Sequence, residues 1–174
     1  MQIVRDSYIW TVGDYIFNIF NAGRDLHTFM SPDRINALAV TEALPGGPAG
    51  PAGGPSLDGL LGCQDRYVRV VRGAECIAEL GLGGPVSALA VVPVAATGGP
   101  GAARHVVYGT SNGSVGLLLV TGSALTPGWV VAPPPATGVS PAAINCMEVC
   151  MCVCVCVCMC VSAGAPLLLA RRTL

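Results

Sequence analysis

The residues best suited to chemistry are six cysteines near the C-terminus, which alternate with valine or methionine. They occupy every even position from Cys150 to Cys160. Thiolates select soft metals, so a looped segment of this composition could hold copper(I) or zinc. In an extended strand, however, alternate residues lie about 6.6 Å apart, too far for neighbouring thiols to share a zinc with bonds of about 2.3 Å. A metal site is therefore one interpretation of this run.

Two other interpretations compete for the same cysteine run. A (TG)n repeat in the coding sequence translates as alternating cysteine and valine, which indicates a gene-model error or intron read-through. The 22 residues from Val149 to Ala170 hold no charge and are long enough to span a bilayer, but Gly164, Pro166 and the valine–cysteine alternation are untypical of a membrane helix. We expect a low-complexity tail over 150–174 that is non-native or disordered and binds no metal or cofactor.

The remaining chemistry-bearing residues do not form a catalytic motif. His27 and His105 are the two histidines, and each lies in or beside a predicted strand, where we expect a surface or packing role. Asp65 and Arg66 are expected to form a turn in which the aspartate caps its own backbone. Gly109 to Gly113 is glycine-rich but lacks the lysine and the following helix of a phosphate-binding loop. The sequence thus predicts no catalytic residue, no cofactor and no enzyme.

Composition excludes several classes of protein. The 23 glycines and 14 prolines among 174 residues leave little room for a long helix, which excludes a coiled coil or helix bundle. Nine basic and ten acidic residues give a net charge of -1, so no basic field points to nucleic acid. The first residues show no secretory signal. Outside the cluster from Cys146 to Cys160 only Cys63 and Cys76 remain, so we expect no disulfide framework and an intracellular location.

A short apolar segment occurs three times and sets the expected architecture. INALAV begins at residue 35, VSALAV at residue 86 and INCMEV at residue 144. Three further strand-like runs follow each of the first two copies, separated by turn residues such as Ser111, Asn112 and Gly113. A tandem unit of four short strands is typical of a β-propeller blade. Trp10 and Trp129 are expected to fill the interfaces between blades, with exposed partner binding as the alternative.

The expected fold class is all-β, a partial β-propeller with about two complete four-stranded blades and parts of two more. We expect the propeller to occupy residues 1–149. Its divisions are a blade end at 1–33, blades at 34–84 and 85–142, and the first strand of a further blade at 143–149. Surplus length falls into two Gly/Pro-rich loops, 43–59 and 93–103, which are expected at the surface. The Pro/Gly run of the first loop is expected to be a disordered insertion, and the alternative is a polyproline II ligand for a partner domain.

The order of the strands and turns also resembles a known family. DYIFN, RINALAV, LGCQDRYVRVVRG, VVYGTSNGSVGLL and INCMEV follow one another along residues 8–149, with CQDRxxRV and GTSxG as the most specific parts. In this order they resemble the N-terminal propeller of the Bardet-Biedl syndrome 7 proteins, subunits of the BBSome coat complex. The resemblance ends at Cys150, and the coiled coil and later domains of that family have no counterpart in this sequence.

The resemblance implies a non-enzymatic scaffold in ciliary membrane-protein trafficking. The implied partners are other BBSome subunits, with membrane-protein cargo reached indirectly, and neither nucleic acid nor a small-molecule substrate is implied. The implied location is the cytoplasm, the ciliary base and the cilium, with membrane association through the complex. A WD-type propeller adaptor of an unrelated complex and a cysteine-rich metal binder remain as alternatives. An arc of blades that does not close would be marginally stable, because open edges and apolar faces would stay uncovered.

Overall fold

The structure is a computed structural model of the whole chain. It describes the backbone of residues 1–5, 7–42, 57–92, 103–121, 124–133, 143–151, 155–161 and 170–171. Side chains are described for residues 1–3, 7–41, 57–92, 103–121, 124–133 and 143–144. Most of the two Gly/Pro-rich loops, and all side chains of the cysteine run, lie outside these ranges.

The described residues form antiparallel sheets in which consecutive strands are neighbours. The first sheet comprises β1 (Gln2–Arg5), β2 (Tyr8–Gly13), β3 (Ile16–Asn21) and β4 (Arg24–Met30). The second comprises β5 (Ile35–Glu42), β6 (Leu57–Cys63), β7 (Tyr67–Arg72) and β8 (Glu75–Gly81). The third comprises β9 (Val86–Val92), β10 (Arg104–Thr110), β11 (Val115–Thr121) and β12 (Ala124–Val131). The fourth comprises β13 (Ile144–Met151), β14 (Val155–Val161) and β15 (Ala170–Arg171).

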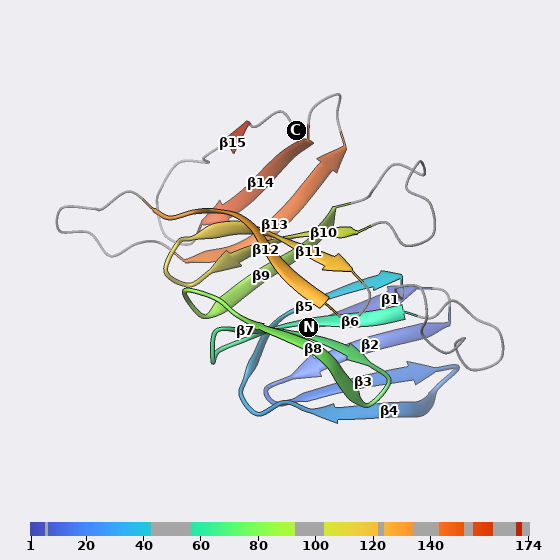
Figure 1. Cartoon of the computed structure of the whole chain (residues 1–174). Coiled ribbons are helices and arrows are strands. Elements are labelled where there is room, and N and C mark those ends of the chain that lie inside the picture. The colour runs from blue at the N-terminus through green and yellow to red at the C-terminus, as the bar shows by residue number, and fades with distance from the viewer. Residues whose placement is uncertain are drawn as a thin grey trace.

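The four sheets succeed one another in chain order, from the blue first sheet to the red fourth sheet (Figure 1). The three copies of the repeated segment are β5, β9 and β13, each the first strand of its sheet. β5 contacts β9, and β9 contacts β13, so these first strands lie beside one another. This arrangement confirms the expected partial β-propeller.

The first sheet is more complete than expected. Residues 1–33 were expected to supply only the end of a blade, whereas β1 to β4 form a four-stranded sheet. Between the second and third strands of this sheet, Asp14 has a φ of 48°. A positive φ at an aspartate is typical of a tight turn. The turn at Asp14 and Tyr15 therefore separates β2 from β3.

The backbone of the C-terminal region also differs from the expected irregular tail. β13 extends to Met151, and β14 pairs with it in antiparallel register. Cys150 lies opposite Cys156, and Cys146 lies opposite Cys160. The alternation of valine with a small residue favours extended backbone, because β-branched residues fit a pleated strand.

The core lies between the sheets. One apolar cluster joins the first and second sheets through residues such as Trp10, Phe17 and Leu61. A second cluster joins the second and third sheets through residues that include Leu60 and Val86. Leu60 and Leu61 are adjacent in β6 and both are 0% exposed, because neighbouring side chains in a strand point to opposite faces. The second sheet is thus buried on both faces, and its stability depends on both neighbouring sheets.

Candidate functional site

Each junction between sheets is closed by an apolar side chain that packs against a glycine. The first residue of β9, Val86, lies against Gly62 of β6, and a Cβ on that glycine would be 2.5 Å from the valine Cγ1. Ile144, the first residue of β13, lies in the same way against Gly109 of β10. In its second and third copies, the repeated segment therefore starts with a β-branched residue that fills the space left by a glycine in the preceding sheet.

The second residue of the repeated segment links the same sheets by a hydrogen bond. Asn36 Nδ2 donates to the carbonyl oxygen of Val86 at 3.2 Å, and Ser87 Oγ donates to the carbonyl oxygen of Ile144. An amide and a hydroxyl thus perform the same task in successive units. The repeat is therefore a packing device along the first strands, where sheets must meet at a fixed spacing.

A buried arginine organises the turn between β6 and β7. The Arg69 side chain is 5% exposed, and it donates to both carboxylate oxygens of Asp65, at 3.0 and 2.6 Å. Its Nε lies 3.4 Å from Oε2 of Glu79 on β8, and its guanidinium carbon lies 5.1 Å from the centre of the Tyr67 ring. Two carboxylates and an aromatic face surround this cation, which leaves it no role in binding an external anion.

Burial and the arginine act in opposite directions on the pKa values of Asp65 and Cys63. Burial acts to raise the pKa of Asp65, but the hydrogen bonds from Arg69 and from the Tyr67 backbone N–H outweigh it, so this pKa lies below its ordinary value. Burial raises the pKa of the Cys63 thiol, although hydrogen bonds with Ser31 and Arg69 act in the opposite direction. A thiol held in its protonated form is a poor nucleophile. Cys63 is therefore a packing residue.

A second ion pair lies inside the same sheet. Asp58 of β6 is 0% exposed, and its two carboxylate oxygens accept hydrogen bonds from Arg72 of β7 at 2.7 and 2.8 Å. The hydrogen bonds that Arg72 donates to Asp58 raise the pKa of Arg72. Bidentate pairing satisfies a charge that would otherwise be costly to bury. This carboxylate is therefore part of the folding core.

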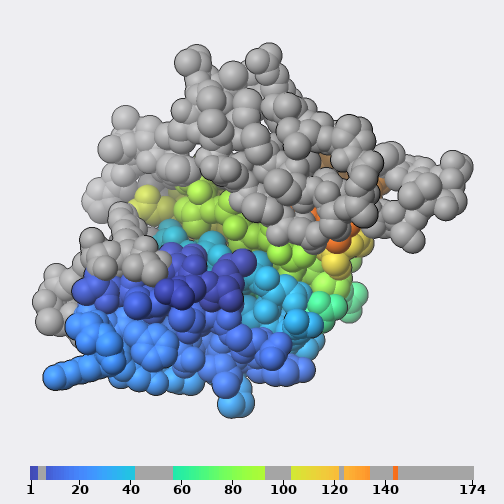
Figure 2. All heavy atoms as spheres, turned by 180° about the vertical axis from the view of Figure 1, so that it is seen from behind, coloured from blue at the N-terminus to red at the C-terminus, as the bar shows by residue number. Residues whose placement is uncertain are grey.

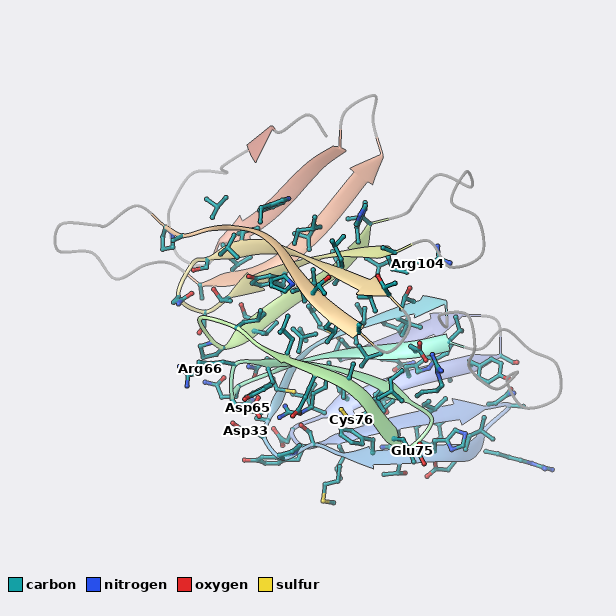
Figure 3. The ribbon with its side chains drawn as sticks, in the orientation of Figure 1. Asp33, Asp65, Arg66, Glu75, Cys76 and Arg104 are labelled. Carbon is teal, nitrogen blue, oxygen red and sulfur yellow. The ribbon has the colours of Figure 1, made fainter. Side chains whose placement is uncertain are left out.

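The structure places the two histidines in different sheets, with His27 exposed and His105 half-buried. His27 lies on β4 of the first sheet, where a Cβ on Gly73 would be 3.6 Å from its ring. His105 lies on β10 of the third sheet, opposite Val92 and Leu119. Within the described residues no three of the His, Cys, Asp and Glu side chains are placed to hold a metal ion. Among the residues labelled in Figure 3, Arg104 lies apart from Asp65 and Arg66.

Two turns noted in the sequence are structural. The backbone N–H of Tyr67 donates to Oδ1 of Asp65 at 3.2 Å, which confirms that the aspartate caps its own turn. Asn112 accepts from the N–H of Ser114 at 3.3 Å and is also bonded to Thr110. Its neighbour Gly113 has a φ of 82°, which glycine adopts without strain. The glycine-rich segment therefore reverses the chain between β10 and β11.

The two tryptophans have opposite environments. Trp10 is 1% exposed between the first and second sheets, as expected, whereas Trp129 is 36% exposed. Trp129 was expected in an interface, but it lies on β12, the outermost strand of the third sheet. The first strands of neighbouring sheets pack closely against each other, whereas the outer strands make fewer contacts between sheets. Side chains on an outer strand are therefore less buried. Beside it, Val130 and Val131 are 56% and 49% exposed, so the candidate interaction surface is β12.

Sequence reasoning missed the two ion pairs. Arg69 alternates with Val68 and Val70 in β7, so only its charge in the middle of the strand could have indicated a buried partner. Asp58 lies within residues 43–59, which were expected to form a surface loop, but the structure places Leu57 to Gly59 in β6 and buries Asp58. In the part of the chain with assigned secondary structure, no helix is suited to crossing a bilayer.

Comparisons with known proteins agree with this architecture. The sequence model of the family described as BBS7 beta-propeller matches residues 1–152. A mouse protein, "BBSome complex member BBS7", is 26% identical over 130 residues, which represent 74% of this chain and 16% of the mouse protein. The chain thus spans about a sixth of that relative.

Solved propellers share the fold at low sequence identity. The WD40 propeller domain of Doa1 has a TM-score of 0.62 and 10% identity, with 91% of this chain and 45% of that domain covered. A structure of BBS1N in complex with ARL6DN has a TM-score of 0.56 and 11% identity, with 91% of this chain and 46% of the other covered. The chain therefore corresponds to slightly less than half the length of each.

Proposed function

The chain belongs to the BBS7 beta-propeller family, and on that premise we propose that it is a non-enzymatic scaffold in a BBSome-like coat complex. The observation that supports this most directly is the family match over residues 1–152, together with first strands that lie side by side in the manner of propeller blades. The scaffold would serve the trafficking of ciliary membrane proteins, as a piece that positions partners and not as a catalyst.

The internal chemistry supports a scaffold. The charged side chains inside the second sheet form two ion pairs, Arg69 with Asp65 and Arg72 with Asp58. Such pairs fix the geometry of turns and strands, and they present no uncompensated charge to a substrate. A rigid array of sheets with exposed edges is suited to docking several proteins at once, which requires no reacting group.

The proposed partners are other BBSome subunits, and cargo membrane proteins would be reached through them. The related propeller BBS1N has been solved in complex with ARL6DN, and this supports a protein-binding role for propellers of this kind. The proposed location is accordingly the cytoplasm, the ciliary base and the cilium. We further infer that residues 1–149 form the functional propeller segment and that 150–174 is an appendage, since the family match ends at residue 152.

Affinity purification from ciliated cells tests this function. The full chain, tagged at its N-terminus, would be recovered and its co-purifying proteins quantified by mass spectrometry. A matched pair of variants provides the control. Gly62→Ala disturbs a sheet junction, whereas Gly13→Ala adds a methyl group in open space. We expect BBSome subunits with the natural chain and with Gly13→Ala, and a loss of them with Gly62→Ala.

Each other outcome counts against the proposal. Recovery of the subunits of an unrelated complex would support a general propeller adaptor instead. Zinc or copper retained in several equivalents by the purified chain would indicate the cysteine-rich metal binder. Absence of BBSome subunits, with the chain folded by circular dichroism, would remove the scaffold function.

A further inference from the structure

The strand register of the C-terminal hairpin brings cysteines of two strands together in pairs. In the antiparallel pairing of β13 with β14, Cys150 is opposite Cys156, and Cys146 is opposite Cys160. Residues opposite each other in an antiparallel pair have Cα atoms about 4.5 or 5.5 Å apart. A disulfide requires a Cα separation of about 4.4–6.8 Å. The backbone pairing therefore brings both pairs of cysteines within the span of a disulfide.

Cysteines that follow one another along a single strand do not meet this requirement. Alternate residues of a strand lie about 6.6 Å apart, and their parallel side chains keep the Cβ atoms about as far apart, whereas a disulfide requires about 3.5–4.5 Å. Cys158 has no cysteine across the pair either, because Glu148 occupies the opposite position. The register thus selects cross-strand partners and leaves Cys158 without one.

The two cross-strand pairs differ in the regularity of the backbone around them. Cys146 and Cys160 adjoin a register shift between Ile144 and Cys146, and a bulge of this kind disrupts the ladder and increases the local twist. Cys150 and Cys156 lie where consecutive residues of β13 and β14 are opposite each other without interruption. This second pair therefore has the more regular geometry.

We propose that Cys150 and Cys156 form a reversible cross-strand disulfide, with glutathione disulfide as the oxidant. The thiolate of one cysteine attacks a sulfur of glutathione disulfide and expels one glutathione thiolate. The thiolate of the second cysteine then attacks the protein sulfur of this mixed disulfide and expels the other glutathione thiolate. The two protein thiols together lose two protons and two electrons, and glutathione disulfide is reduced to two molecules of glutathione.

The hairpin lies at one end of the arc of sheets. Figure 1 places β13 and β14 beyond the third sheet, while the first sheet, blue in Figure 1 and Figure 2, forms the other end. β13 contacts β9 and β10, Ile144 packs against Gly109, and Ser87 Oγ donates to the carbonyl oxygen of Ile144. The disulfide would tie β14 to the strand that makes these contacts.

Closure of the short loop from Cys150 to Cys156 restricts the unfolded chain. We expect oxidation to raise the midpoint of thermal unfolding by about 5 °C, from the loop-closure entropy of this cross-link. The same bond fixes β14 against β13 in the folded chain. The redox state of one pair of cysteines would therefore control the stability of this end of the arc.

The register favours a disulfide over a zinc site. Structural zinc sites have four cysteine or histidine ligands. Beside Cys150 and Cys156, on the same face of the ladder, the next pair of positions holds Glu148 and Cys158. These four positions supply three cysteines and a glutamate, whereas a disulfide requires only the one opposed pair.

Cyanogen bromide mapping of the full chain tests the proposal, because this reagent cleaves after methionine. Cleavage at Met147, Met151 and Met159 places Cys150 in the fragment 148–151 and Cys156 in the fragment 152–159. The chain is equilibrated without oxygen in mixtures of glutathione and glutathione disulfide, and free thiols are then blocked with N-ethylmaleimide. We expect the two fragments to be joined in oxidising mixtures and separate in reducing ones. Tandem mass spectrometry of the joined fragments should locate the bond at Cys156.

A matched pair of variants identifies the partner of Cys150 independently. Cys156→Ser should lower the joined fraction at least tenfold and remove the effect of oxidation on the thermal midpoint. Cys158→Ser, the same change two residues along β14 and opposite Glu148, should leave both unchanged. Far-UV circular dichroism verifies that the variants fold, and the bond located in the natural chain tests the proposal without any substitution.

Several results would overturn the proposal. One is the absence of joined fragments in every mixture, and another is a bond from Cys150 to a cysteine other than Cys156. Glutathione that stays attached to Cys150, or zinc or copper retained in place of the disulfide, would also overturn it. The disulfide is independent of BBSome binding. A chain that forms it but recovers no BBSome subunits removes only the proposed function, and a chain that recovers them without it removes this inference alone.

Discussion

A Cβ atom on Gly62 would lie 2.5 Å from Cγ1 of Val86, the residue that begins the repeated strand of the next sheet. The next junction repeats this relationship with Gly109 and Ile144. The recurrence explains why the segment returns along the chain. The first residue fills a glycine-lined space in the second and third copies, and the second residue bonds to the backbone of the following sheet in the first and second copies. The repetition is a requirement of sheet-to-sheet spacing.

Gly62→Ala should therefore destabilise the protein. The added methyl group meets Val86 and also lies 3.1 Å from Cβ of Ala37, so two sheets must separate to accept it. Overpacking of this kind costs about 1–3 kcal/mol, measured as the free energy of unfolding in urea. Gly13→Ala is the control, since nothing lies within 4 Å of its added Cβ. Equal free energies of unfolding for the two variants would show that the sheet junction accepts the methyl group without loss of stability.

Removing Arg72 from its ion pair with Asp58 should cost more stability than removing the charge of Asp58. Arg72→Met leaves a fully buried carboxylate without its cation, and breaking such a pair costs about 3 kcal/mol or more. Asp58→Asn keeps an oxygen that accepts from Arg72, whose side chain is 21% exposed and can reach water. We expect the arginine variant to lose more stability in urea unfolding. The reverse order would show that the carboxylate is hydrated.

Asp65 should make stability depend on pH in the acid range. Its pKa is lower in the folded chain than in the unfolded chain, where it is about 4. The contribution of the ion pair is thus complete above that unfolded value and is lost as pH falls through the lower folded value. The stability difference between the natural chain and Asp65→Asn should shrink in this window.

Thermal unfolding at a series of pH values measures that difference. Asp25→Asn is the matched control, because this exposed carboxyl lies on β4 of the first sheet, whereas Asp65 and Arg69 belong to the second sheet. Its stability difference from the natural chain should change less across the window than that of Asp65→Asn. A constant difference for Asp65→Asn down to the lowest pH would contradict the ion-pair explanation.

Sequence patterns predicted the sheets where period-two alternation and turn residues coincide. The second sheet illustrates this, because Tyr67-Val68-Arg69-Val70 alternates and Asp65 starts its turn. The four strands of the first sheet were not all predicted, since the turn at Asp14 joins two apolar runs without glycine or proline inside it. The period of alternation in a strand and the residue types of a turn are local properties, so both can be identified directly in the sequence.

The candidate interaction surface was harder to predict. Trp129 resembles Trp10 in type, and both stand in apolar strands. The two differ in position: Trp10 lies on β2 between two sheets, whereas Trp129 lies on β12, the outermost strand of its sheet. This difference depends on how whole sheets pack together. The Asp58–Arg72 pair is likewise a cross-strand contact, between β6 and β7, and it involves a residue that was expected to lie in a surface loop. Environments of this kind follow from tertiary packing.

Trp10 should tolerate phenylalanine better than its burial indicates. Among the described side chains its Nε1 is the one buried polar atom without a hydrogen-bond partner, and an unsatisfied buried donor costs about 1–3 kcal/mol. Trp10→Phe leaves a small cavity but removes that cost, so the net loss should be no more than about 1 kcal/mol. Trp10→Ala empties the space between the first two sheets and should cost about 3–5 kcal/mol. Urea unfolding of both variants, followed by far-UV circular dichroism, measures the contrast. If Trp10→Phe lost as much stability as the alanine variant, the indole N–H would have to be bonded, for example to a buried water.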